Sequence, residues 1–190
     1  MRYVRAVAFA LLAAGCAPPP GSLTALAGPA REGNLATIQR LIAAGANPNE
    51  TDPGGNHWTP LLHAIHKEQP AAVDLLIRSG ADPKLATASG FSPLLMAVGS
   101  GNAAIVRRLL DAGADPRSDD RILLTAISGG ALSDLDNPLL GRCNTEVVKA
   151  LMQRAPDLRV RPDARGRIAT LFARWNHCND VVQSITRQGS

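Results

Sequence analysis

Aromatic residues, cysteines, strong net charge and long apolar runs are all scarce in this chain of 190 residues. Aromatics make up only 3% of it, which argues against a β-sandwich, because strands of that class use β-branched and aromatic side chains. The net charge of +4 is mild, and nucleic-acid-binding domains usually carry a much stronger basic footprint, so no nucleic-acid partner is expected. Hydrophobic residues reach 45%, enough for the core of one domain of closely packed helices.

The middle of the chain is internally repeated. The run Thr59-Pro60-Leu61-Leu62-His63-Ala64-Ile65 recurs 33 residues later as Ser92-Pro93-Leu94-Leu95-Met96-Ala97-Val98. The run Gly80-Ala81-Asp82-Pro83 recurs after the same interval as Gly113-Ala114-Asp115-Pro116. Two independent motifs with one period predict a stack of similar structural units. The pattern resembles the ankyrin repeat, whose signature is T-P-L-H-x-A, then G-N or G-H, a leucine-rich helix and G-A-D.

That resemblance implies an all-α ankyrin-repeat solenoid of about five helix-turn-helix repeats with finger loops. The repeats are expected near residues 24–52, 53–85, 86–118, 119–161 and 162–190. Thr59 and Ser92 are expected to be N-caps, because their hydroxyl oxygens can accept hydrogen bonds from free N–H groups at a helix start. Gly80 and Gly113 are expected to follow the second helices in the left-handed conformation.

Repeats four and five depart from the pattern. In repeat four the finger is short, Arg121 replaces the capping threonine, and about thirteen extra residues near 130–142 are expected to form a surface loop. Repeat five has Ile168 to Ala173 in place of the T-P-L run and is expected to act as a C-terminal cap, because terminal repeats need only one neighbour.

The N-terminus has the character of an export signal. Two arginines precede an apolar stretch at residues 6–14, which is too short to span a bilayer as a mature helix. The segment ends Leu12-Ala13-Ala14-Gly15-Cys16, which resembles the lipobox of bacterial lipoproteins. The resemblance implies cleavage before Cys16 and acylation of its thiol. Ala13 stands where leucine is commonest, so an ordinary signal peptide cut nearby stays open as an alternative.

Three segments are therefore expected: a lipoprotein signal peptide at 1–15, a Pro-rich tether at 16–23 and the repeat domain at 24–190. The non-acidic residue after the cysteine, Ala17, follows the pattern that in Gram-negative lipoproteins implies the outer membrane. The expected location is the periplasmic side of the cell envelope, with membrane contact through the lipid anchor only.

Cys143 and Cys178 remain once Cys16 is set aside. An even pair in an exported protein favours a disulfide, which would close a 35-residue loop. Both cysteines occupy the same position in adjacent repeats, and packed helices lie about 10 Å apart, whereas a disulfide needs Cα atoms about 4.4–6.8 Å apart. We expect the bond, since the preceding insert lets one turn lean toward the next. A reactive thiol at Cys178 beside His177 is the alternative.

His57, His63 and His66 lie close together in the sequence, and the last two share one helix face. A metal site needs a third and usually a fourth ligand, and no cysteine or H-E-x-x-H pattern supports one here. We therefore expect no catalytic residues, no metal and no cofactor. A metal-dependent or enzymatic protein that uses these three histidines is kept as the alternative.

Ankyrin proteins bind through their finger tips and the concave side of their first helices. The residue just before each capping position is Trp58, Phe91, Asp120 or Arg167 in successive repeats. The two aromatics are the main candidates, because tryptophan and tyrosine are enriched among residues that dominate binding energy. The alternative is that the two side chains fold back onto their own stack, where they would not be free to contact a partner. Further expected contacts are His57, His63, Met96 and Arg121.

The predicted function is a non-catalytic, monomeric protein–protein interaction module in the bacterial cell envelope. It would sequester, inhibit or position a protein partner, and an immunity-type inhibitor of an envelope-active effector is one form of that role. The C-terminal part is rich in arginine. These side chains form either a solvated face or a docking surface for an acidic partner.

Overall fold

A computed structural model describes residues 24–53, 57–128, 144–160 and 164–175, together with Asp180 and Gln183. Within these residues the chain forms nine helices and no strand, which confirms the all-α class. The helices are α1 (Ala27–Glu32), α2 (Leu35–Ala43), α3 (Pro60–His66), α4 (Pro70–Arg78), α5 (Pro93–Gly99), α6 (Ala103–Asp111), α7 (Arg121–Ser128), α8 (Thr145–Arg154) and α9 (Ala164–Trp175).

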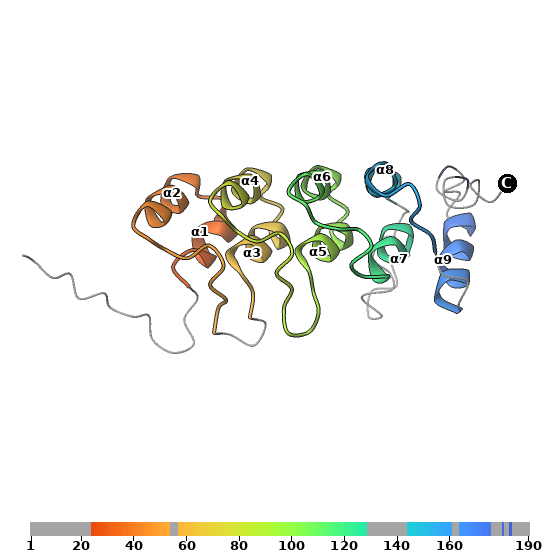
Figure 1. Cartoon of the computed structure of the whole chain (residues 1–190), viewed down its shortest axis with the longest axis horizontal. Coiled ribbons are helices and arrows are strands. Elements are labelled where there is room, and N and C mark those ends of the chain that lie inside the picture. The colour runs from red at the N-terminus through yellow and green to blue at the C-terminus, as the bar shows by residue number, and fades with distance from the viewer. Residues whose placement is uncertain are drawn as a thin grey trace, which may run out of the picture.

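The helices form two layers that run the length of the molecule (Figure 1). The first helices of successive repeats pack in the order α1, α3, α5, α7 and α9, and the second helices pack in the order α2, α4, α6 and α8. Finger loops project from the side of the first helices (Figure 1). Helix α9 runs across the direction of the other helices (Figure 1), so the stack changes at its C-terminal end. We call the side that carries the loops the finger side.

Capping residues define most helix starts. The Thr59 hydroxyl accepts a hydrogen bond from the Leu62 N–H at 3.3 Å, and the Ser92 hydroxyl accepts one from the Leu95 N–H at 3.1 Å, as predicted. Asparagine takes the same role before three second helices, through Asn34, Asn102 and Asn144. Gly80 and Gly113 follow their helices with φ of 92° and 93°, the left-handed conformation expected of them.

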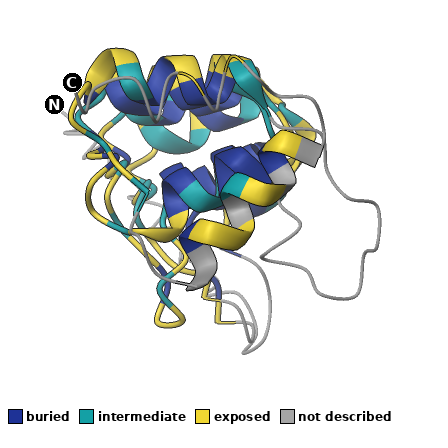
Figure 2. Cartoon of the chain, turned by 90° about the vertical axis from the view of Figure 1, so that its right-hand side faces the viewer, coloured by how far each residue is buried: buried dark blue, intermediate teal, exposed yellow. Residues whose placement is uncertain are grey.

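The core lies between the two layers, where buried residues face one another (Figure 2). Ala64 in α3 and Ala97 in α5 are fully buried, and a larger side chain would not fit such close packing without moving its neighbours. In the second helices α4 and α6 the buried apolar residues include Val73, Leu76, Ile105, Val106, Leu109 and Leu110. Leu75 and Ile77 are only half-buried and pack against the edge of the core.

Two helices in the irregular repeats start earlier than the motif alignment suggests. Arg121, which replaces the capping threonine, is already the first residue of α7. Its backbone N–H donates a hydrogen bond to Asp119 Oδ1 at 2.8 Å. An aspartate two residues earlier therefore supplies the cap. Helix α9 begins at Ala164, four residues before Ile168, which aligns with Thr59.

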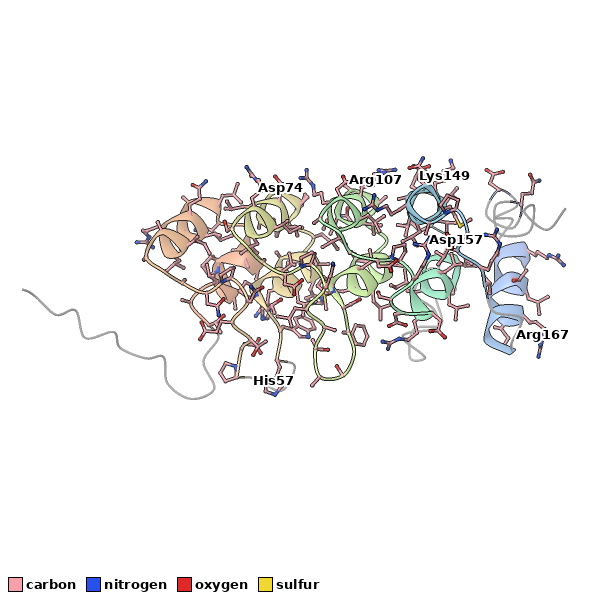
Figure 3. The ribbon with its side chains drawn as sticks, viewed as in Figure 1. His57, Asp74, Arg107, Lys149, Asp157 and Arg167 are labelled. Carbon is pink, nitrogen blue, oxygen red and sulfur yellow. The ribbon has the colours of Figure 1, made fainter. Side chains whose placement is uncertain are left out.

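The second-helix side carries a row of exposed ion pairs between repeats (Figure 3). A carboxylate oxygen of Asp74 lies 2.7 Å from Arg108, and one of Glu146 lies 3.1 Å from Arg107. Exposed pairs of this kind contribute little to stability, so the apolar core between the layers holds the repeats together.

Candidate partner-binding surface

The first two fingers close through the same pair of hydrogen bonds. In the first finger the Asp52 N–H donates to the Trp58 carbonyl at 2.9 Å, and the Trp58 N–H donates to Asp52 Oδ1 at 3.2 Å. In the second the Thr87 N–H donates to the Phe91 carbonyl at 3.0 Å, and the Phe91 N–H donates to Thr87 Oγ1 at 3.0 Å. The two aromatics therefore occupy equivalent structural positions, although the first finger is two residues longer.

Trp58 lies back against its own repeat. Its ring meets the ring of His63 edge-to-face at a centroid distance of 5.3 Å and the ring of His66 at 5.1 Å. The side chain is half-buried as a result. For Trp58 the structure thus favours the fold-back alternative, although the side chain is not fully buried.

His63, which is expected to contact the partner, exposes little surface. Its side chain is buried, and Nε2 lies 2.7 Å from the buried Asp52 Oδ2. The physical reason is that a carboxylate taken out of water at the finger base needs a hydrogen-bond partner, and the helix supplies it. This pair ties the first finger to α3. The sequence signal was Asp52 itself, which stands where the second finger has Thr87.

His66 is exposed at the end of α3 beside the indole of Trp58. Partial burial holds the pKa of its imidazole below the usual value, and the nearby positive charges of Lys67 and Arg31 and the imidazole of His63 lower that pKa further. The neutral imidazole is therefore favoured in the folded protein.

Phe91 is 38% exposed and is held in place by Arg121. The guanidinium carbon lies 5.8 Å from the centre of the Phe91 ring, and Arg121 Nη2 donates to the Gly90 carbonyl at 2.7 Å. The same guanidinium pairs with Asp119 at 2.6 Å. That hydrogen bond holds the pKa of the Asp119 carboxyl below its usual value. We call Gly90, Phe91, Asp119 and Arg121 the Phe91 cluster.

The other predicted contact residues are more scattered. His57 is exposed on the finger side with φ of 48°, next to Trp58 (Figure 3). Met96 is half-buried and packs on the core, and Asp120 is exposed beside the Phe91 cluster. Arg167 is exposed but lies inside α9, because that helix begins at Ala164. Its predicted equivalence with Trp58 and Phe91, as the residue before a helix start, is therefore wrong.

The histidines do not assemble into a metal centre within the described part of the chain. No group of three or more His, Cys, Asp or Glu side chains there is placed to hold a metal ion. The Trp58 ring contacts both His63 and His66, and Asp52 is the group that pairs with His63.

Several predictions fall on residues outside those described. They are the signal peptide at 1–15, Cys16 and the tether, the insert near 130–142, and the Cys143–Cys178 disulfide with its alternative at His177. Among the described residues no helix combines the length and apolar character needed to cross a membrane.

Comparison with known proteins places the chain. A family model for ankyrin repeats, three copies long, matches residues 26–120. The human 2-5A-dependent ribonuclease is 42% identical over 53 residues, which is 28% of this chain and only 7% of that relative. The human ASB11 ankyrin repeat domain aligns with a TM-score of 0.65 and 24% identity, covering 87% of this chain and 69% of that one.

These three similarities support different conclusions. The structural neighbour supports the fold alone, and the short match to the ribonuclease covers too little of that protein to transfer its activity. The family match spans half of the chain and includes the first two fingers and the capped helices α2, α3, α5 and α6. This chain belongs to the ankyrin-repeat family, whose fold is generally a non-catalytic scaffold for protein–protein interaction.

Proposed function

We propose that this protein is a lipid-anchored binding module on the periplasmic side of the bacterial cell envelope, and that it holds a protein partner on its finger side. The observation that supports this most is the pair of aromatic residues at equivalent positions of adjacent fingers, Trp58 and Phe91. Phe91 is the stronger anchor of the two, because its ring remains exposed.

The Phe91 cluster has the features of a binding hot spot. Aromatic and arginine side chains dominate binding energies when a partner covers them. The ring is already held by Arg121, which is itself bonded to Gly90 and Asp119. Because these groups are ordered before a partner arrives, little side-chain entropy is lost on binding.

The anchor fits such a binder. We propose that Cys16 carries the lipid and that Ala17 directs the protein to the outer membrane. The eight residues of the tether reach at most about 28 Å when fully extended, at roughly 3.5 Å per residue. The first repeat would therefore stay close to the membrane surface, where a captured partner is held as well.

An anchored binder can sequester, inhibit or position its partner. Among these roles we favour sequestration with inhibition, including the immunity-type case in which the partner is an effector that acts in the cell envelope. In this proposal the module acts by covering its partner, and anchoring keeps it where such an effector would arrive.

The binding proposal is tested with the full chain carrying Cys16→Ser, tagged and exposed to periplasmic extract of its own organism. We expect a retained protein whose capture is lost in Phe91→Ala. The matched control is Leu35→Ala on α2, since Leu35 is 37% exposed and Phe91 38%. Equal capture by both variants would move the site away from Phe91, and no capture by the unsubstituted chain would count against a binding module.

The anchor is tested separately in cells fed a labelled fatty acid. We expect label on the wild-type chain, none on Cys16→Ala, and wild-type protein in the outer-membrane fraction. A chain without label, secreted into the periplasm, would instead support the ordinary signal peptide.

A further inference from the structure

A cavity of about 180 Å³ lies beside the Phe91 cluster, where the short finger of repeat four leaves space. The cavity is lined by residues of that finger between Pro116 and Arg121 and by the segment 158–160, which precedes α9 in the sequence. Because Arg121 both lines the cavity and contacts the Phe91 ring, the cavity and the cluster form one continuous surface.

The cavity lining combines apolar side chains with arginines. Leu123 and Leu124 of α7 line it together with Leu158, Val160 and Pro116. Charged side chains complete the lining, and three of them are arginines, Arg117, Arg121 and Arg159. The other two are Asp119 and Asp120, so an apolar group that enters meets apolar side chains bordered by charges of both signs.

Two of these arginines already have carboxylate partners. Arg117 pairs with Asp157, and Arg121 pairs with Asp119 at 2.6 Å. The Arg159 guanidinium donates to the carbonyls of Pro156 and Leu158 at 2.9 and 2.8 Å. An isolated anion would have to compete with the carboxylates, so the balanced charges favour a neutral ligand over an anionic one.

The size of the cavity limits the ligand to one ring. An apolar cavity of about 150 Å³ accommodates benzene, whereas pockets for drug-sized ligands start at about 300 Å³. Guanidinium groups favour the faces of aromatic rings over other neutral groups. Arg121 shows this preference within the molecule, since it already lies over Phe91.

We propose that this cavity receives one phenylalanine or tyrosine side chain of the protein partner, next to the contact made by Phe91. The inference rests on the proposed function for the existence of that partner, but the ligand class of the cavity can be tested without it. The segment of the partner that carries this aromatic side chain would lie across Arg121 and cover both the cavity and the Phe91 ring.

The first test uses p-cresol, the side-chain analogue of tyrosine, with the full chain carrying Cys16→Ser. In methyl NMR spectra we expect saturable shifts at Leu124, Leu158 and Val160 in the millimolar range. The half-buried methyl groups of Leu75 on α4 serve as the internal control and should not move. No saturable shift at the cavity methyl groups, or equal shifts at Leu75, would overturn the proposal.

Two comparisons sharpen that test. Val160→Trp fills the cavity from a half-buried position in a connecting segment, and it should abolish the cresol shifts while the rest of the spectrum shows an intact fold. Cyclohexanol has a similar size without a ring face, and we expect it to bind at least several-fold more weakly. Equal affinities for cresol and cyclohexanol would refute selection of an aromatic ring.

A capture experiment then separates this inference from the proposed function. If the unsubstituted chain retains a partner, Val160→Trp should reduce the amount of partner captured at least tenfold. A partner retained equally by Val160→Trp would overturn the cavity proposal and leave the binding module standing. Failure to capture any partner would count against the proposed function and against a partner side chain in the cavity, whereas the cresol result would still show which ligands the cavity accepts.

Discussion

Leu62 and Leu171 align with each other in the sequence pattern of the repeat but differ in environment. Leu62 in α3 is 0% exposed, because α3 has a first helix on either side, α1 and α5. Leu171 in α9 is 63% exposed, and α9 packs against α7, the first helix of the preceding repeat. The fold therefore predicts opposite results for one chemical change, truncation of each leucine to alanine.

The expected cost follows from burial. Removing a fully buried leucine loses the transfer free energy of the side chain, about 1.5–3 kcal/mol, and leaves a cavity that adds to it. Leu62→Ala should therefore lower the free energy of unfolding by about 2–5 kcal/mol. Leu171→Ala should change it by no more than about 0.5 kcal/mol, because the position is on the surface.

Urea unfolding followed by far-ultraviolet circular dichroism and by tryptophan fluorescence measures both variants. Coincident transitions are required before a free energy is assigned, since repeat arrays can unfold in stages. Similar losses in the two variants would refute the exposed position of Leu171 on α9. A small loss for Leu62→Ala alone would refute the packing of α3 between its neighbours.

Three further outcomes are expected. Asp119→Ala should lower the free energy of unfolding, measured in urea, by about 0.5–2 kcal/mol, because the first N–H group of α7 loses its hydrogen-bond acceptor. A change near zero would show that this cap is dispensable. Because the pKa of His66 is lowered in the folded protein, the unfolded chain binds a proton first as pH falls through the ordinary value of 6.5, and the free energy of unfolding should decrease there. In His66→Gln this decrease with falling pH should be smaller. An unchanged pH dependence in that variant would assign the decrease to other groups. If Cys143 and Cys178 are bonded, the denatured, unreduced protein should resist alkylation at both sites, and reduction should cost about 3–4 kcal/mol; alkylation of both would exclude the bond.

The regular part of the fold was predictable because its signals are local. The Thr59 and Ser92 caps each bond to an N–H group three residues ahead, so a short run of sequence defines each helix start. The period of 33 residues then places neighbouring units without any knowledge of their contacts.

The irregular repeats were less predictable because other residues perform the same roles. Asp119 caps α7 from a position that the motif does not mark, and α9 starts before the run that aligns with the motif. Alignment to the repeat therefore misplaced Arg167 relative to the helix start, although the helix itself was expected.

Exposure at the finger bases depended on three-dimensional contacts. Trp58 and Phe91 are equivalent in sequence and backbone bonding, but Trp58 packs on two histidines that repeat three lacks. Those positions are Met96 and Gly99 in the next repeat, so Phe91 has no matching imidazoles beneath it. The Asp52–His63 pair was missed for the same reason, since its partners come from a finger and a helix that only folding brings together.

The most direct measurement of the central claim places a photo-crosslinking amino acid at position 91 of the full chain in living cells. Position 35 carries the same amino acid as the control, because the two native side chains are almost equally exposed, but Leu35 belongs to α2 whereas Phe91 lies in the finger before α5. We predict one protein adduct at position 91 that is absent at position 35. No adduct at position 91, or the same adduct at both positions, would contradict a partner-binding surface on the finger side.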